Sequence, residues 1–282
     1  MNVLIFGSRG YIGSQFLQLY PGAAAPSVDI ADAAAVAAIL DTEKPDVVIN
    51  AAGKTGRPNV DWCEDHRMET LRSNVTGPLT LLEECGKRGI YWVHLGSGCI
   101  YAGDNGGRGF TEEDPPNFEG SFYSFTKNVS DRVLQRFTSP AGGTGGVLNL
   151  RLRMPFDGTT SPRNLLTKLK GYAKVLDVPN SMTFIPEFLS AAAALIGRRS
   201  TGTFNMVNEG AISPYEIMTM YRDIVDPSHT FERLTLQELP GIVKAVRSNC
   251  VLSCAKLREA GIVLSPVRSV VGDALRTLRK AG

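Results

Sequence analysis

The sequence has few of the residues that mark a metal centre, a disulfide scaffold or a membrane protein. It has three histidines and five cysteines in 282 residues, and neither zinc-ligand nor disulfide spacing occurs among Cys63, Cys85, Cys99, Cys250 and Cys254. No apolar run approaches the roughly 20 residues that a membrane-spanning helix needs. Basic and acidic residues nearly balance, at 30 and 28, for a net charge of +2. We therefore expect no metal, no nucleic-acid surface and no membrane contact.

The composition is that of an ordinary globular protein. Hydrophobic residues make up 43% and charged residues 21%, and the chain is long enough to bury a full core in one large domain or two smaller ones. It opens on the apolar residues 2–6 rather than on a secretory leader. Free cysteines suit a reducing compartment, so we expect a cytoplasmic protein.

A glycine-rich turn follows the first apolar run. Residues 2–6 predict a short buried strand, and the spacing of Ile12, Phe16 and Leu19 predicts a helix. Between them lies a G-x-x-G-x-x-G pattern, which brings backbone N–H groups and a helix N-terminus to a phosphate. The residues expected to hold a dinucleotide here are Gly7, Ser8, Arg9, Gly10, Tyr11, Ile12 and Gly13.

Arg9 within this turn predicts the choice of cofactor. A guanidinium here can bind the 2′-phosphate of NADPH in bidentate fashion. The usual NAD signature is an acidic residue at the end of the second strand, but residues 21–26 are rich in Gly, Ala and Pro and predict a short or eroded strand. We expect NADPH, with NADH as the alternative.

Apolar runs and helical spacing predict the remaining elements. Strands are expected at residues 46–49, 91–95, 147–152 and 203–207, and helices at 33–40, 68–88, 164–174 and 191–196. The glycine-rich residues 141–146 precede a strand instead of following one, so they predict a surface loop.

A serine, a tyrosine and a lysine form the second constellation. Ser97 follows the apolar residues 91–95, at the carboxyl end of a strand, where open α/β sheets keep their chemistry. Tyr123 and Lys127 are four apart at the start of a helical pattern and share one face of it. A phenol has an ordinary pKa of about 10, and a nearby ammonium favours its ionised form. Ser97 and Tyr123 can then hold one substrate oxygen.

Ser97, Tyr123 and Lys127, placed after the glycine turn, resemble the short-chain dehydrogenase/reductase family of the extended type. The resemblance implies an α/β fold, a Rossmann-type doubly wound parallel sheet with a smaller, mostly C-terminal substrate-binding part. The dinucleotide domain would span residues 1–154 with a returning segment at about 186–207, and the substrate part 155–185 and 208–282. Further cofactor contacts are implied at Asp29, Ile30, Asn50, Ala51, Ala52, Gly53, Asn74, Lys127 and Met154.

A closer resemblance extends over most of the chain. Its runs are residues 53–64, 98–100, 120–124, 151–155, 162–164, 178–183 and 247–249. They look like those of the bifunctional nucleotide-rhamnose synthases, the 3,5-epimerase/4-reductases. This implies that UDP- or dTDP-4-keto-6-deoxy-D-glucose is epimerised at C3 and C5 and reduced at C4 by NADPH, giving the L-rhamnose nucleotide. A nucleotide-glucose 4,6-dehydratase would be the functional partner.

The same resemblance implies the remaining site residues. Cys99 lies two residues beyond Ser97, on the same side of the chain if the strand continues. A thiol, with an ordinary pKa of about 8.5, ionises more readily beside a cation. Lys168 matches the lysine that the resembled enzymes use as partner acid. Substrate contacts are implied at Thr55, Gly56, Arg57, Asn164, Asn180, Met182 and Arg247.

Two other readings stay open at this point. One is a dTDP-4-dehydrorhamnose reductase without epimerase activity, against which Cys99 and Lys168 argue. The other is a non-catalytic regulatory subunit on the same fold, like the β-subunit of methionine adenosyltransferase. Extended-type relatives pair through the helices that begin near Met68 and Tyr123, so we also expect a homodimer.

Overall fold

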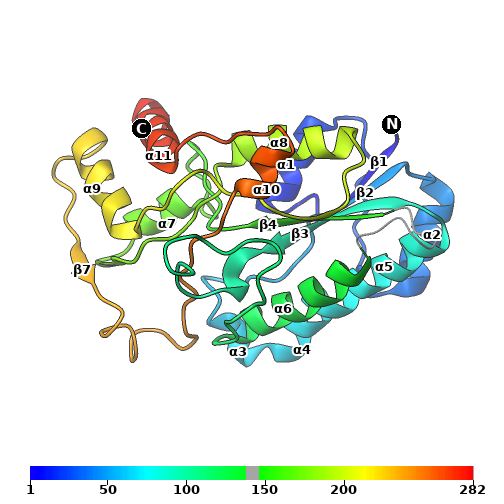
Figure 1. Ribbon diagram of the computed structural model, residues 1–282, viewed down its shortest axis with the longest axis horizontal. Coiled ribbons are helices and arrows are strands. Elements are labelled where there is room, and N and C mark those ends of the chain that lie inside the picture. The colour runs from blue at the N-terminus through cyan, green and yellow to red at the C-terminus, as the bar shows by residue number, and fades with distance from the viewer. Residues whose placement is uncertain (138–145, 282) are drawn as a thin grey trace.

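Five parallel strands form one sheet in the order β1–β2–β3–β4–β6. The computed structural model describes residues 1–137 and 146–281, so the loop predicted at 141–146 lies almost wholly outside the described residues. Helices cover both faces of the sheet (Figure 1), which confirms the doubly wound α/β fold. The strands are β1 (Val3–Phe6), β2 (Val47–Asn50), β3 (Tyr91–Ser97), β4 (Val147–Leu152) and β6 (Gly202–Asn205).

Both faces of the sheet are apolar, because the strands are buried on both sides. On one face, Ile5 and Val93 pack against Phe16 and Phe188, from the helices α1 and α8. The first face is covered by α1 (Tyr11–Leu19) and α8 (Ile185–Gly197). The opposite face is covered by α2 (Ala33–Glu43), α5 (Gly77–Lys87) and α6 (Phe122–Leu134).

The segment between α1 and α2 forms only an isolated bridge with β1. Ile5 N donates to Ala24 O at 2.8 Å, and Ala24 N donates to Val3 O at 2.9 Å. Pro21 and Pro26 flank this point and lack the N–H that a ladder needs. The eroded second strand is therefore confirmed.

The helix predicted over residues 68–88 is interrupted. It consists of α4 (Arg67–Leu71), a π-helical turn η1 (Arg72–Thr76) and then α5, preceded by the short α3 (Trp62–Asp65). Pro78 lies in the first turn of α5 and has no N–H to give to the carbonyl four residues earlier, so a uniform α-helix is wrong here. The helix predicted over 164–174 is also shorter, because α7 (Leu165–Lys170) ends before Gly171.

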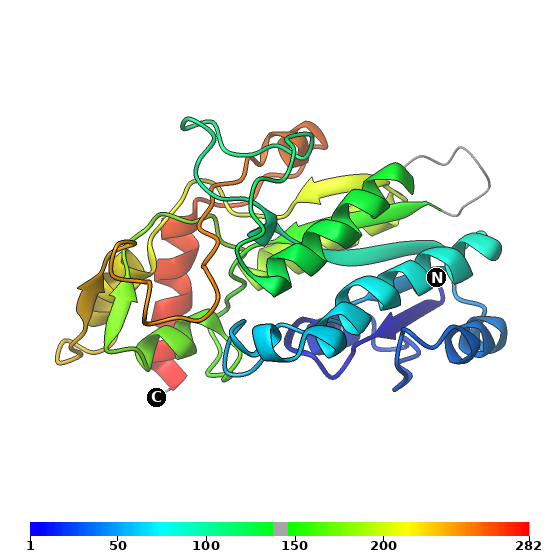
Figure 2. The same ribbon diagram turned by 90° about the horizontal axis from the view of Figure 1, so that it is seen from below.

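A second, smaller core lies beside the sheet, at the left of Figures 1 and 2. Phe156, Met182, Ile217 and Val271 are buried in it. Its elements are α7, β5 (Lys174–Leu176), α9 (Pro214–Ile224), β7 (Glu232–Leu234) and α11 (Val267–Ala281), with β5 and β7 pairing in parallel.

The chain passes between the two cores several times. It leaves the sheet after β4, returns with α8 and β6, and leaves again for α9. It then returns with α10 (Ala255–Glu259), whose Leu257 packs in the sheet core, before α11 completes the second core. The predicted domain division stays a prediction, and α10 is the segment that packs outside the part given to it. None of the helices in the described part of the chain has the length and apolarity to cross a bilayer.

Candidate active site

The glycine turn after β1 lies directly against the turn after β2. Gly7 has a φ of 76°, and a Cβ there would lie 2.4 Å from Ala52 N. A Cβ on Gly13 would lie 2.1 Å from Gly7 O. Neither position has room for a side chain, so two of the predicted cofactor-binding turns touch through their backbones.

The N-terminus of α1 is open to an anion. Gly10 is its N-cap residue, no side chain caps it, and its first turn has no acidic residue. The positive end of the helix dipole and the first N–H groups are therefore available to a phosphate. Arg9 is exposed beside this turn. These features fit a dinucleotide with a 2′-phosphate.

We expect Arg9→Ala to weaken NADPH binding far more than NADH binding, because only NADPH has the 2′-phosphate. A hydrogen bond to a charged group contributes about 1.5–3 kcal/mol, so the NADPH Kd should rise about ten- to hundredfold. Titration of protein fluorescence with each cofactor measures this, with Arg198→Ala, a surface arginine bonded to Ala260 O, as control. Equal weakening of both cofactors would show that Arg9 does not read the phosphate.

Asp29 and Ile30, for which the resemblance implies cofactor contacts, lie between the bridge to β1 and the start of α2. The Asp29 carboxylate accepts from Arg72 Nε at 2.7 Å and from Ala31 N at 3.0 Å. These bonds, the Ala31 N–H first, lower the pKa of Asp29. Ile30 is buried and lies against Gly77, where a Cβ would meet it at 2.5 Å. Asp29 is thus held as an acceptor and Ile30 is fixed by packing, and their contacts with a cofactor stay a prediction.

Asn74 ties the turn after β2 to α6. Its Oδ1 accepts from Lys54 N at 2.8 Å, and its Nδ2 donates to Lys54 O at 2.9 Å and to Thr126 Oγ1 at 3.2 Å. Asn74 lies in the π-helical turn η1, a conformation frequent at functional sites. It therefore holds the loop that carries Gly53, Thr55 and Gly56 in place against the helix of Tyr123.

Ser97 and Cys99 are brought together by a 3₁₀ turn. β3 ends at Ser97, and Gly98–Ile100 form the short helix η2. Ser97 Oγ donates to Cys99 Sγ at 3.0 Å and accepts from Cys99 N at 3.3 Å. The predicted closeness of the two side chains thus arises from a helical turn, not from strand alternation.

Tyr123 lies in the first turn of α6, whose N-cap is Ser121. Burial raises the pKa of the Tyr123 phenol above its ordinary value, and negative charge at Cys99 adds to this. The Ser97 hydroxyl and the Arg153 guanidinium act in the opposite direction. Ser97, Cys99 and Tyr123 therefore share one site, with the phenol protonated at neutral pH.

Lys127 points into the sheet. Its Nζ donates to Leu95 O at 2.9 Å and lies 3.4 Å from His94 Nε2. Burial lowers the pKa of Lys127 to about 8. The expectation that Lys127 makes the phenol more acidic is not met by this arrangement, because the ammonium is directed to the β3 backbone and the pKa of Tyr123 is raised.

His94 is a site residue that sequence reasoning missed. It is fully buried beneath Lys127, and its Nδ1 lies 3.1 Å from Asn50 Nδ2. Burial, then the Lys127 charge, lowers the pKa of His94 well below its usual range, so the ring is neutral. Asn50 Oδ1 in turn accepts from Ala52 N at 3.0 Å. His94 therefore links Lys127 to the turn at Ala51 and Ala52. Its place three residues before Ser97 on the same strand was the available signal.

Lys168 lies on α7, between the two cores. Its side chain is partly buried, and burial, followed by the charge of Arg163, lowers its pKa. No hydrogen bond or ion pair joins Lys168 to Cys99 in residues 1–137 and 146–281. A lysine with a lowered pKa suits proton transfer, and its pairing with Cys99 stays a prediction.

Two asparagines predicted to contact substrate use their side-chain amides in hydrogen bonds to other groups of the protein. Asn164 caps α7 and its Nδ2 donates to Asp157 O at 2.8 Å and Thr159 O at 2.6 Å. Asn180 Nδ2 donates to Val178 O at 3.0 Å, and its Oδ1 accepts from Arg153 Nη2 at 2.5 Å. In this structure both side chains shape the backbone of the second part.

The other predicted substrate contacts fall into two groups. Met182 is fully buried in the second core. Met154, predicted as a cofactor contact, lies at the edge of this core with a φ of 42°. Arg247 makes a bidentate pair with Asp61, at 2.6 and 3.0 Å, which lowers the pKa of Asp61. That pair joins the C-terminal part to the loop of Arg57, which is exposed.

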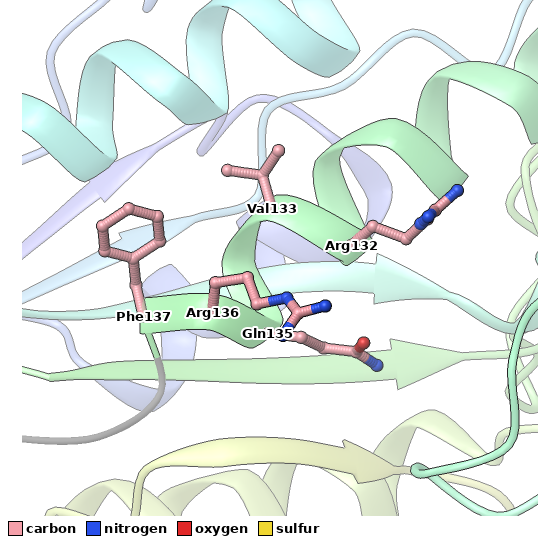
Figure 3. Close-up of a pocket in the computed structure, with 5 residues that line it drawn as sticks. All are labelled: Arg132, Val133, Gln135, Arg136 and Phe137. Carbon is pink, nitrogen blue, oxygen red and sulfur yellow. The ribbon is translucent and has the colours of Figure 1, made fainter.

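The described residues hold no cluster of three or more His, Cys, Asp or Glu side chains arranged for a metal. A surface pocket at the far end of α6 is lined by Arg132, Val133, Gln135, Arg136 and Phe137 (Figure 3). It begins nine residues after Tyr123, a rise of roughly 14 Å along a helix. This pocket therefore lies away from Tyr123, at the other end of α6.

The sheet, the glycine turn and the Ser97–Tyr123–Lys127 set define an extended short-chain dehydrogenase/reductase. A family model described as the RmlD substrate binding domain matches residues 1–139. The bifunctional dTDP-4-dehydrorhamnose 3,5-epimerase/dTDP-4-dehydrorhamnose reductase of Arabidopsis thaliana is 42% identical over 267 residues, covering 91% of this chain and 86% of the relative. The chain belongs to this family of nucleotide-rhamnose synthases, and it is an oxidoreductase.

Solved structures give the same assignment. The L780 UDP-rhamnose synthase of Acanthamoeba polyphaga mimivirus superposes with a TM-score of 0.91 at 33% identity, over 98% of this chain and 99% of the other. A dTDP-4-dehydrorhamnose reductase of Bacillus anthracis in complex with NADP shares the fold, with a TM-score of 0.82 at 17% identity over 100% and 99% of the chains.

A trifunctional dehydratase/epimerase/reductase of Arabidopsis thaliana is 37% identical over 92% of this chain, which spans only 39% of that relative.

Proposed function

We propose that this protein converts UDP- or dTDP-4-keto-6-deoxy-D-glucose to the corresponding L-rhamnose nucleotide. It would epimerise C3 and C5 and then reduce C4 with NADPH. The observation that carries the proposal is the 3.0 Å contact between Cys99 Sγ and Ser97 Oγ. This contact places an ionisable thiol beside the hydroxyl that would hold the C4 oxygen.

The epimerisation follows from the acidity of the protons next to a ketone. Ser97 and Tyr123 hydrogen-bond the C4 oxygen and stabilise the negative charge that forms there when a proton leaves C3 or C5. Cys99 serves as the base on one side of the ring. Lys168, with its pKa lowered by burial and by Arg163, returns a proton from the other side, so each carbon inverts.

The reduction uses the same hydrogen bonds. The turns at residues 7–13 and 50–53 would hold NADPH, which would supply the hydride for reduction at C4. Tyr123 gives its phenolic proton to the C4 oxygen, which becomes the hydroxyl of the product. The raised pKa of Tyr123 keeps that proton in place before the reaction. Lys127, anchored on Leu95 O, would hold the cofactor ribose.

The nucleotide and sugar would be held by residues from both parts of the chain. Thr55, Gly56 and Arg57 lie on the loop after β2, and the Asp61–Arg247 pair fixes this loop against the C-terminal part. The exposed Arg57 is suited to a diphosphate. Asn164, Asn180 and Met182 would shape the sugar site through the backbone that they fix.

Incubation with each 4-keto sugar nucleotide and NADPH, followed by product analysis, tests the proposal. The L-rhamnose nucleotide is the expected product, and its rates of formation from UDP and dTDP substrates give the preference. Reduction without inversion at C3 and C5 would make the protein a reductase only. An untouched keto sugar would indicate a non-catalytic regulatory subunit.

The substrate itself requires a preceding reaction. A 4-keto-6-deoxy sugar arises by loss of water from a nucleotide glucose, so we infer a nucleotide-glucose 4,6-dehydratase as functional partner. The trifunctional relative, whose name includes this activity, supports the inference. We place both enzymes in the cytoplasm, where nucleotide sugars and NADPH are available.

We predict a homodimer that pairs through α4, α5 and α6. α5 and α6 lie side by side on one face of the molecule (Figure 2). Met68 on α4 and Phe125 on α6 are exposed at 75% and 37%, and Phe137, in the 3₁₀ turn that follows α6, at 42%. Burying such side chains against a second copy is favourable. Light scattering at micromolar concentration should give twice the mass of the chain, and Phe125→Glu should lower it. A monomeric wild type would contradict the prediction.

A further inference from the structure

Two arginines at the end of β4 are both buried, but they differ in whether a carboxylate pairs with them. Arg151 has no exposed surface and makes a bidentate pair with Asp131, at 2.6 and 2.9 Å. Arg153 is 9% exposed, and no carboxylate lies within ion-pairing distance of it in the described part of the chain. The same strand end thus holds one neutralised guanidinium and one that is not.

The Arg153 guanidinium is fixed at one end and free at the other. Its Nη2 donates to Asn180 Oδ1 at 2.5 Å and to the Ser248 carbonyl. Its Nε is buried and has no partner in residues 1–137 and 146–281. A guanidinium has five N–H donors, so the Nη2 bonds orient the group and leave the Nε–H unused.

Arg153 lies against the catalytic turn. Its Cδ would lie 3.7 Å from a Cβ on Gly98, the residue between Ser97 and Cys99. Its positive charge acts on the Tyr123 phenol and on the thiol of Cys250. Cys250 Sγ in turn donates to Gly98 O at 3.2 Å. The guanidinium without a carboxylate partner therefore lies beside the turn that carries Ser97 and Cys99, and its charge acts on Tyr123.

Burying an arginine without a carboxylate is costly, and that cost is offset when an anion arrives. Preorganised positive charge stabilises a transition state because it is already in place when negative charge develops. We propose that Arg153 is the fixed cation of this active site, stabilising the negative charge that moves between Cys99, the substrate C4 oxygen and Tyr123. This inference rests on the proposed function and adds a residue to it.

One cation would serve both steps. When Cys99 takes the proton from C3 or C5, the C–H electron pair moves into the bond to C4 and negative charge forms on the C4 oxygen. When the hydride has reached C4 and Tyr123 has given its proton to the oxygen, the negative charge remains on the phenolate. Arg153 is close to the groups that hold the charge in each case, and Lys127 is directed to the β3 backbone.

The test compares Arg153→Gln with Arg153→Lys. Glutamine keeps a donor for Asn180 but removes the charge, and lysine keeps the charge. We expect Arg153→Gln to lower two rates by about 10²- to 10³-fold, which is the loss seen on removing one oxyanion donor. These are deuterium exchange at C3 and C5 without NADPH, and single-turnover reduction of a keto sugar already epimerised. Arg153→Lys should recover at least about tenfold over Arg153→Gln in both.

A chemical rescue keeps the test decisive if these variants lose stability. Guanidinium at millimolar concentration should restore exchange in Arg153→Gly, whereas urea, which has a similar shape and no charge, should not. Arg258→Gln, which removes a surface arginine paired with Glu209, is the matched control and should leave both rates unchanged.

Rates of Arg153→Gln within about threefold of wild type would overturn the proposal, as would a folded Arg153→Lys as slow as Arg153→Gln. Equal rescue by urea and guanidinium would show that shape and not charge is needed. If the wild-type enzyme reduces the keto sugar but does not exchange the protons at C3 and C5, only the epimerase proposal is refuted. The role of Arg153 is then tested by the reduction rates of its variants alone.

Discussion

Tyr123→Phe is expected to lose reduction of the C4 ketone by about 10²- to 10⁴-fold, the usual contribution of a general acid. The substitution removes one oxygen, and the phenol is the only proton donor that the proposal assigns to the C4 oxygen. Burial keeps this phenol protonated, so wild type is ready to donate at neutral pH. Stopped-flow oxidation of NADPH with an epimerised keto sugar measures the loss.

The control for this variant is cofactor binding. Tyr123 is not among the residues of the glycine turn, so the NADPH Kd of Tyr123→Phe should equal that of wild type. Tyr215→Phe, in the second part of the chain, removes another phenol and should reduce at the wild-type rate. A Tyr123→Phe enzyme with near-normal turnover would refute the dehydrogenase mechanism for this site.

Cys99→Ser should abolish exchange at C3 and C5 while reduction survives. Serine keeps the approximate size of the side chain but replaces the thiol, the proposed base, with a hydroxyl. Ser97 and Tyr123, which would polarise the ketone, are left intact. In heavy water without NADPH, wild type should place deuterium at both carbons of the keto sugar, and Cys99→Ser should place it at neither within the same time. Mass spectrometry and NMR of the recovered sugar measure this.

A second arm separates lost chemistry from lost structure. Given keto sugar that another enzyme has already epimerised, Cys99→Ser should still oxidise NADPH at a rate within about tenfold of wild type. Cys85→Ser, at a thiol buried in the core between the sheet and α5, is the matched control for exchange. Lys168→Ala should resemble Cys99→Ser, with exchange surviving at one carbon. If Cys99→Ser exchanges both protons at the wild-type rate, the bifunctional proposal is wrong and a reductase without epimerase activity replaces it.

The local motifs were predictable because their geometry is set by neighbouring residues. Gly7 and Gly13 are required by close backbone approaches, and the G-x-x-G-x-x-G spacing carries that requirement in a few residues. The α/β order followed from hydrophobic runs. Even the erosion of the second strand was readable, because prolines at 21 and 26 remove the donors of a ladder.

What could not be predicted depends on contacts between distant segments. The direction of Lys127 is decided by His94 and Leu95 on β3, and no spacing on its own helix indicates this. That Asp131 lies beside Arg151, and that none of the described residues places a carboxylate beside Arg153, are equally tertiary facts. The amides of Asn164 and Asn180 bond to backbone carbonyls, which carry no residue identity, and Asn180 also bonds to Arg153, which is distant in the sequence.

The repeated passage of the chain between its two cores has an evolutionary consequence. A substrate-binding part encoded by one continuous stretch could be exchanged between genes in a single recombination event. Here the second core draws on segments before α8, after β6 and after α10, so one crossover would join mismatched halves of both cores. New sugar specificity in such a lineage has to accumulate by point substitution in loops such as that of Arg57, or by fusion of whole enzymes end to end.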